Sequence, residues 1–129
     1  MRIEHVAIWT KDVERLRRFY ETYFGAAAGA KYVNRGRRFQ SYFLSFPEGG
    51  RLELMQEPGV ADAPGGEGTT RAGYGHVALA VGSEEQVDEL TRRLWQDGYR
   101  VADGPRRTGD GYYESVVLDP DGNRLEITA

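Results

Sequence analysis

The amino-acid sequence contains one short pattern twice, and this internal repeat constrains the fold more than any other feature. Ile3–Ile8 reads Ile-Glu-His-Val-Ala-Ile, and Tyr74–Leu79 reads Tyr-Gly-His-Val-Ala-Leu. Each half then ends on a matching run, Arg51–Leu54 (Arg-Leu-Glu-Leu) and Arg124–Ile127 (Arg-Leu-Glu-Ile). The glutamate follows the histidine by 48 positions in the first half and by 50 in the second. Agreement in motif, order and spacing indicates a duplicated module.

Each half is predicted to form one helix and four strands in the order β-α-β-β-β. Apolar residues recur at helical spacing over Val13–Phe24, with Asp12 as a plausible N-cap and Gly25 as the terminator. A second helix is expected between Ser83, which starts a capping box, and Gly98. The first strand of each half contains its histidine. The other expected strands are β-rich runs at 31–34, 39–46, 51–56, 100–103, 113–118 and 124–128.

The segment 58–73 is predicted to be a linker, because it holds five glycines and two prolines and shows no apolar periodicity. Module 1 then spans about 1–57 and module 2 about 74–129. A module of this size buries too little apolar surface to be stably folded by itself, so we expect the two modules to form a single domain over 1–129. The predicted fold class is α+β, with two tandem βαβββ modules forming a cupped mixed sheet.

The amino-acid composition excludes several kinds of functional site and several classes of partner. The absence of cysteine excludes disulfides, thiolate ligands and cysteine nucleophiles, so any metal must be held by nitrogen and oxygen. The 17 basic and 20 acidic residues give a formal charge of -3, which argues against a nucleic acid or a membrane surface as partner. No apolar run approaches the roughly 20 residues of a membrane span, and the amino terminus lacks the apolar stretch of a signal peptide. We therefore expect a cytoplasmic protein.

Two histidines and two glutamates are the candidates for a functional site. Alternation along a strand places each histidine among uncharged neighbours and each glutamate opposite its flanking aliphatic residues. A single residue of this kind more often has a structural role, either solvated or hydrogen-bonded. The repeat favours function, because two imidazoles and two carboxylates suit a divalent first-row metal. The predicted ligands of this metal site, around which the sheet would cup, are His5, Glu53, His76 and Glu126.

The sequence resembles the vicinal oxygen chelate superfamily, and within it the glyoxalase I (lactoylglutathione lyase) branch. The resemblance covers essentially the whole chain, and its most specific motif is the closing run Leu118–Ile127 (Leu-Asp-Pro-Asp-Gly-Asn-Arg-Leu-Glu-Ile). It implies paired modules around a divalent ion held by the four residues above, commonly in a homodimer. Ni²⁺ or Zn²⁺ is the implied ion, with Fe²⁺, Co²⁺ and Mn²⁺ as alternatives.

The implied reaction moves a proton between neighbouring carbons of a hemithioacetal formed from a 2-oxoaldehyde, which gives a 2-hydroxyacyl thioester. Glu126 and Glu53 are the candidate catalytic bases, and Glu126 is slightly favoured. Glutathione-using members carry an arginine four residues after the first histidine and an asparagine four residues after the first glutamate. Trp9 and Glu57 stand at these positions here. The resemblance therefore implies either another thiol or a substrate that is not a thiol adduct.

Four residues are candidates for substrate binding. They are Trp9, Tyr113, and two arginines of a basic cluster, Arg37 and Arg38. A solvated loop is the structural alternative for the arginines, and core packing is the alternative for the aromatic residues.

Two other functions stay open, each with a small-molecule ligand. One is another metal-dependent enzyme of the superfamily, such as an extradiol-type dioxygenase, an epimerase or a thiol transferase. Oxidative cleavage needs open metal positions for oxygen as well as substrate, which a fourth protein ligand opposes. The other is a metal-free binding protein of the bleomycin-resistance type, which the complete ligand set argues against. The sequence does not decide whether the modules pair within one chain or across a homodimer.

Overall fold

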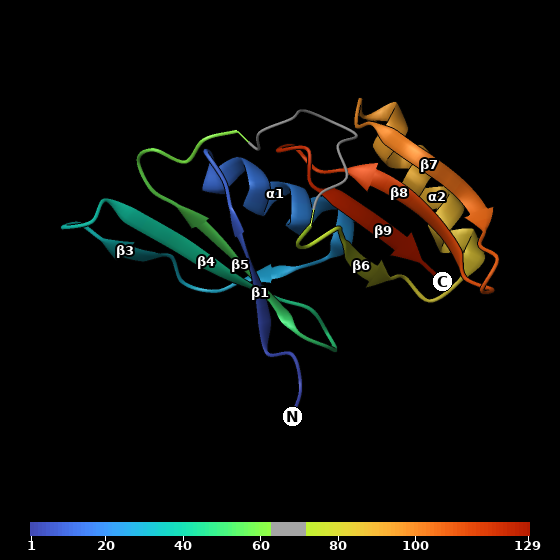
Figure 1. Ribbon diagram of the computed structural model, residues 1–129, viewed down its shortest axis with the longest axis horizontal. Helices are drawn as coiled ribbons and strands as arrows, with labels where there is room; N and C mark the ends of the chain where they lie inside the picture. Colours follow the sequence, from blue (N-terminus) through green and yellow to red (C-terminus); the bar gives the residue numbers. More distant parts are fainter. Residues whose placement is uncertain (63–71) are drawn as a thin grey trace. The chain divides into compact units, whose positions relative to one another are not determined.

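The structure is a computed structural model that describes residues 1–62 and 72–129. The chain divides into two compact units, Met1–Pro64 and Gly65–Ala129, and each contains one helix and one sheet (Figure 1). This confirms the mixed α+β class predicted from the sequence. Most of the predicted linker, at 63–71, lies outside the described residues. No helix in the described part of the chain is long and apolar enough to cross a membrane.

The first unit has five strands and one helix. In chain order the elements are β1 (His5–Trp9), α1 (Val13–Phe24), β2 (Ala27–Ala28), β3 (Tyr32–Asn34), β4 (Phe39–Ser45) and β5 (Arg51–Gln56). The sheet order is β1-β5-β4-β2, and β3 also pairs with β4. β1 runs parallel to β5, whereas β4 and β5 are antiparallel. The two-residue strand β2 is absent from the sequence prediction, because two alanines carry no β signal of their own.

Helix α1 begins and ends where the sequence predicts. The side chain of Asp12 accepts a hydrogen bond from the backbone N–H of Arg15 at 2.9 Å, which caps the amino end. Gly25 ends the helix in the left-handed conformation, with φ of 62°. The buried face of the helix packs on β4 and β5. It consists of Val13, Leu16, Phe19 and Tyr20.

The two faces of the first sheet differ in what covers them. Leu52 and Leu54 are buried on the side that packs against α1. Burial of each such side chain contributes about 1.5–3 kcal/mol. Glu53 alternates to the other face, and the register of β1 with β5 pairs Ala7 with Glu53. His5 therefore lies on the same helix-free face as Glu53.

The second unit repeats this plan with four strands. Its elements are β6 (Val77–Ala80), α2 (Glu84–Gln96), β7 (Val101–Arg107), β8 (Tyr113–Leu118) and β9 (Arg124–Thr128), in the sheet order β6-β9-β8-β7. β6 runs parallel to β9, and Ala78 pairs with Glu126. The sequence predicts the bounds of β8 and β9 exactly as observed. It predicts too short a β7, which continues through two register shifts to Arg107.

Both ends of α2 follow the sequence pattern. The hydroxyl of Ser83 accepts a hydrogen bond from the backbone N–H of Gln86 at 3.3 Å. At the other end Gly98 adopts a φ of 90°, and the N–H of Tyr99 donates to the carbonyl of Leu94 at 2.9 Å. This left-handed termination is the Schellman arrangement, for which glycine is the favoured residue.

The closing motif of the sequence forms the turn between β8 and β9. Asp119 is buried, and its Oδ1 atom accepts hydrogen bonds from the backbone N–H groups of Asp121 and Asn123, both at 2.9 Å. Its Oδ2 atom accepts a third from the side-chain amide of Asn123 at 2.8 Å. Burial raises the pKa of Asp119, and the hydrogen bonds from Asn123 oppose that change. The turn fixes the hairpin that presents Glu126 on β9.

Candidate functional site

His5 and Glu53 approach one another on the helix-free face of the first sheet. The Nε2 atom of His5 is 3.8 Å from the Oε2 atom of Glu53. Phe43, which pairs with Glu53 across β4 and β5, meets the imidazole edge-on at a centroid distance of 5.2 Å. The carboxylate of Glu53 is largely covered, with 17% of its side chain exposed, whereas the imidazole of His5 is more open. This arrangement offers one nitrogen and one oxygen donor side by side.

Glu4 orients the His5 ring from the other side. Its carboxylate contacts the Nδ1 atom of His5 and also accepts a hydrogen bond from Nε of Arg51 at 2.9 Å. Hydrogen bonds from His5 and then from Arg51 lower the pKa of Glu4. A carboxylate beside Nδ1 favours the tautomer with the proton on that nitrogen, which leaves the lone pair of Nε2 for a metal ion. Metal-binding histidines commonly have a partner of this kind.

His76 and Glu126 form the equivalent pair in the second unit. Their Nε2 and Oε2 atoms are 3.1 Å apart, and His76 immediately precedes β6. The neighbours of Glu126 in register are Ala78 on β6 and Val116 on β8, so no charged side chain lies directly beside it on either strand. The Glu126 side chain is 22% exposed.

Both pairs have the donor chemistry of a divalent metal site. Ligand atoms bound at about 2.0–2.2 Å to one ion lie roughly 3–3.5 Å from each other. The 3.1 Å separation in the second unit matches this range, and the 3.8 Å separation in the first lies slightly above it. Within residues 1–62 and 72–129 no group of three or more histidine or carboxylate ligands is assembled. Each unit therefore offers two donors.

Trp9 and Arg37, both predicted to bind substrate, lie near one another in the first unit. Trp9 ends β1 on the same face as His5 and meets the ring of Phe39 edge-on at 6.1 Å. The guanidinium of Arg37 lies over that same ring at 5.9 Å, and its Nη2 atom is 3.7 Å from the carboxylate of Glu57. Trp9 remains 46% exposed. These side chains form a partly open aromatic surface with a paired charge at its edge.

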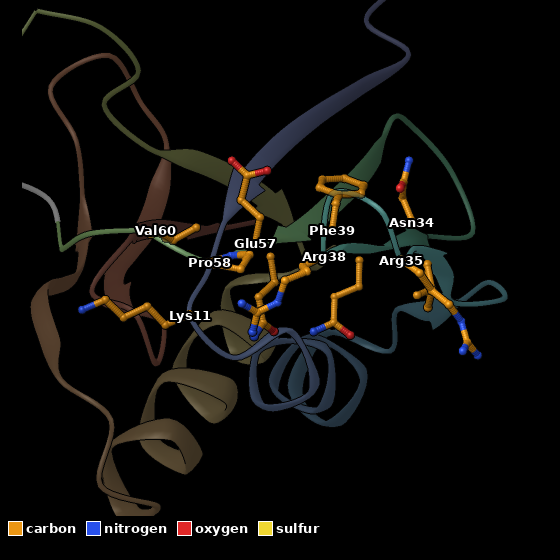
Figure 2. A pocket seen from close by; sticks show the side chains of 12 residues that line it. Lys11, Asn34, Arg35, Arg38, Phe39, Glu57, Pro58 and Val60 are labelled. Carbon is orange, nitrogen blue, oxygen red and sulfur yellow. The ribbon is translucent and has the colours of Figure 1, made fainter.

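The other two predicted binding residues, Arg38 and Tyr113, belong to different units. Arg38 lines a cavity at the ends of β4 and β5 (Figure 2). The hydroxyl of Tyr113 donates to Asp88 of α2 at 2.7 Å. This places Tyr113 on the helix-covered face of the second sheet, opposite Glu126. The hydrogen bond to Asp88 raises the pKa of Tyr113.

Sequence reasoning overlooked Glu4 and Phe43, the two side chains that surround the His5 ring. Strand alternation assigns Glu4 to the face opposite His5, because adjacent residues in a strand point apart. Glu4 precedes β1, so this rule does not hold it there. Phe43 is recognisable only once the register of β4 with β5 is known, since the strand sequence does not specify its partner.

Comparison with known families agrees with the fold. The model of the Glyoxalase/Bleomycin resistance protein/Dioxygenase superfamily matches residues 2–127. The chain belongs to this superfamily. The match includes both histidine strands and both glutamate strands, so the resemblance inferred from the sequence motifs is confirmed.

Several members of the superfamily are similar to this chain. Glyoxalase I of Saccharomyces cerevisiae is 24% identical over 97% of this chain and 44% of the yeast protein. The structure of the trypanothione-dependent glyoxalase I of Leishmania major gives a TM-score of 0.78 at 24% identity, over 99% of this chain and 86% of that one. The structure of a possible glyoxalase from Bacillus cereus gives a TM-score of 0.71 at 29% identity, over 100% of this chain and 99% of that one.

The matches cover only part of these curated relatives. The chain spans about half the length of the yeast protein. An uncharacterised Bacillus subtilis protein, YqjT, is 39% identical over a segment that covers 46% of this chain and 48% of YqjT. The likenesses establish the superfamily and its fold. Superfamily members typically bind a divalent metal.

Proposed function

We propose that this chain is a metal-dependent enzyme of the glyoxalase I type, which isomerises the hemithioacetal of a 2-oxoaldehyde to a 2-hydroxyacyl thioester. One observation carries the proposal. Each unit holds a histidine Nε2 beside a glutamate Oε2, at 3.8 Å and 3.1 Å, at equivalent positions of the repeat. A single contact of this kind has an ordinary structural explanation, whereas its recurrence in both halves favours a common role.

The residues that would hold the metal are His5, Glu53, His76 and Glu126. Neutral imidazoles and carboxylates are suitable ligands for Ni²⁺ or Zn²⁺, and two carboxylates balance the charge of a divalent ion. When bound, such an ion polarises neighbouring substrate oxygens and makes the hydrogen on the adjacent carbon acidic. The contact between Glu4 and Nδ1 of His5 supports this role, because it presents Nε2 as a ligand atom.

Glu126 is the residue that we propose as the base. Its carboxylate would take the proton from one substrate carbon and return it to the neighbouring carbon, so the residue is regenerated in each turnover. Its register neighbours, Ala78 and Val116, are aliphatic, so neither of them binds the carboxylate oxygens. Glu53 is the alternative base, and substitution of each glutamate distinguishes the two.

The thiol part of the substrate is proposed to be something other than glutathione. Trp9 and Glu57 occupy the two positions where glutathione-using members carry an arginine and an asparagine. Glu57 is moreover paired with Arg37, and Trp9 packs on Phe39. The Leishmania major relative is described as trypanothione-dependent, so another thiol has a precedent within this fold.

Elemental analysis followed by an isomerisation assay tests the proposal. We expect about one divalent ion per purified chain, and turnover of the hemithioacetal of methylglyoxal with at least one low-molecular-weight thiol. Full activity in metal-free protein would contradict every metal-dependent function. Bound metal without turnover for any thiol would overturn the glyoxalase activity in favour of an epimerase or dioxygenase. Light scattering of the same preparation tests the predicted homodimer.

A further inference from the structure

Two polar side chains on the helix-free face of the second sheet have no role in the proposed mechanism, Glu114 on β8 and Thr128 on β9. On β8, the hydroxyl groups of Tyr113 and Ser115 both form hydrogen bonds to side chains of α2, at 2.7 and 2.6 Å. Adjacent residues of a strand point to opposite faces, so Glu114 points away from the helix. On β9, Thr128 follows the fully buried Ile127 and therefore also points away from the helix.

Glu114 and Thr128 lie beside Glu126, the proposed base. β9 lies between β6 and β8 in the sheet (Figure 1), and Thr128 is two residues beyond Glu126 on the same face of β9. The register pairs Glu114 directly with Thr128, and it pairs Val116 with Glu126. Glu114 is therefore the diagonal neighbour of Glu126, and residues in such positions are about 7 Å apart. The two polar side chains and the proposed base share one surface.

Neither Glu114 nor Thr128 has its hydrogen-bonding capacity satisfied. The Oγ1 atom of Thr128 is buried and has no hydrogen-bond partner among the described residues. The Glu114 side chain is only 12% exposed, and its one ion pair within 1–62 and 72–129 is to Arg106 at 3.9 Å. Arg106 binds Asp103 more closely, through Nε at 2.8 Å and Nη2 at 2.7 Å. Buried polar groups without partners are uncommon and costly, so we expect a bound group to satisfy these two.

We propose that Glu114 and Thr128 bind a hydroxyl group on the substituent of the 2-oxoaldehyde, so that the substrate is a hydroxylated 2-oxoaldehyde. A carboxylate only accepts hydrogen bonds, whereas a threonine hydroxyl both donates and accepts. A substrate hydroxyl that donates to Glu114 and accepts from Thr128 satisfies both groups at once. The inference rests on the proposed function, because it takes the reacting carbons to lie at Glu126. A separation of about 7 Å suits the short aldehyde substituent better than the far end of an elongated thiol.

A matched pair of aldehydes tests the requirement for the hydroxyl. The substrates are the hemithioacetals that methylglyoxal and 3-hydroxy-2-oxopropanal form with N-acetylcysteamine, which differ by one hydroxyl group. We expect kcat/KM to be at least about 10-fold higher for the hydroxylated substrate. Glu114→Leu should reduce this ratio to about one, and Thr128→Val should reduce it by a smaller factor. Glu89→Leu, at an exposed position of α2, is the control and should retain the full ratio.

A second pair of substrates tests which end of the substrate carries the hydroxyl. The methylglyoxal hemithioacetals of 2-mercaptoethanol and 1-propanethiol are nearly equal in size and differ in a terminal hydroxyl on the thiol. We expect similar values of kcat/KM for these two substrates. A preference for the mercaptoethanol adduct that Glu114→Leu abolishes would contradict the assignment to the aldehyde substituent.

A binding measurement separates failure of this inference from failure of the proposed function. Calorimetric titration of the metal-loaded protein with lactate and with glycerate requires no turnover, and these two acids differ by the same hydroxyl group. Stronger binding of glycerate that is lost in Glu114→Leu supports the site even where no hemithioacetal is isomerised. Equal binding of both acids, binding of neither, or a preference that persists in Glu114→Leu overturns the inference.

Thermal unfolding in the absence of substrate distinguishes a binding role of Thr128 from a structural one. Because its Oγ1 atom has no partner, Thr128→Val removes an unsatisfied hydroxyl and keeps the shape of the side chain. We therefore expect the melting temperature to stay the same or to rise by a few degrees. A fall of several degrees would show that the hydroxyl stabilises the fold, and would overturn its assignment to the substrate.

Discussion

The Nε2 atom of His76 lies 3.1 Å from the Oε2 atom of Glu126, closer than the 3.8 Å between the corresponding atoms of His5 and Glu53. The ring of His5 is held between two carboxylates, because Glu4 contacts its Nδ1 atom. The two pairs thus share a chemistry and differ in their surroundings. Glu126 combines the close imidazole with aliphatic neighbours, which is why we favour it as the base.

Replacing Glu126 by glutamine tests its role. The amide has nearly the same shape, so we expect the fold to survive, as measured by circular dichroism and thermal unfolding. It cannot accept a proton and is a poor ligand, so kcat should fall by at least about 100-fold. Metal content per chain, measured on the same sample, should fall as well.

Two further variants give this experiment its controls. Glu89→Gln, on the exposed side of α2, makes the same chemical change away from the pairs and should leave activity unchanged. Glu53→Gln separates the candidates, since a larger loss of kcat there than in Glu126→Gln would identify Glu53 as the base. Full activity in both glutamine variants would contradict the proposed function.

Metal removal should lower stability by an amount that depends on both pairs. A ligand that binds only the native state at 100 times its dissociation constant stabilises by about 2.7 kcal/mol. We therefore expect a chelator to lower the melting temperature of the wild type, and to have little effect on His5→Ala or His76→Ala. The comparison is informative because each variant leaves the other unit's pair intact. A chelator effect that persists in both variants would show that one pair is a sufficient site.

The alternation rule predicted the faces of β5 correctly, and its success has a simple physical cause. One side of the strand is covered by α1 and the other is not, so Leu52 and Leu54 are buried while Glu53 lies opposite. The capping residues Asp12 and Ser83 were equally predictable, because their hydrogen bonds are made within three residues.

The sequence could not predict features that depend on more distant contacts. β8 is buried on both faces from Ser115 to Leu118, so its alternation is lost and the face of Tyr113 is not evident. The bond from Tyr113 to Asp88 joins residues 25 positions apart. Gly104 and Pro105 suggest the end of a strand, yet β7 continues past them because register shifts accommodate both.

Glu14 should make the protein sensitive to acid. Its carboxylate accepts hydrogen bonds from Lys31 at 3.0 Å, Tyr42 at 2.8 Å and Arg17 at 3.1 Å, which connect α1 to β4 and to the residue before β3. These bonds, that of Lys31 first, lower the pKa of Glu14 from 4.5 to about 2. A group whose pKa falls on folding stabilises the native state above its unfolded pKa. This contribution is therefore lost as the pH falls from about 5 toward 2.

Glu14→Gln should make the free energy of unfolding depend less on pH between about pH 5 and pH 2. At neutral pH we expect a loss of only about 1 kcal/mol in the free energy of unfolding, because water screens a side chain that is 36% exposed. Urea unfolding at neutral pH and at about pH 3 measures both effects. Glu48→Gln, in the exposed turn before β5, is the matched control and should keep the wild-type slope. An identical slope in Glu14→Gln would show that these hydrogen bonds do not govern acid sensitivity.

Gly104 should be intolerant of any side chain. A Cβ atom there would lie 2.7 Å from the carbonyl oxygen of Glu114 and 3.1 Å from the backbone of Ser115, and its φ of 74° disfavours other residues. Since β7 must move away from β8 to admit a methyl group, we expect Gly104→Ala to cost about 2 kcal/mol in denaturant unfolding. The displaced β8 carries Val116, the neighbour of Glu126, so metal affinity should fall too. Gly109→Ala has no such contact and should match the wild type; equal stability of the two variants would contradict the close approach of β7 and β8.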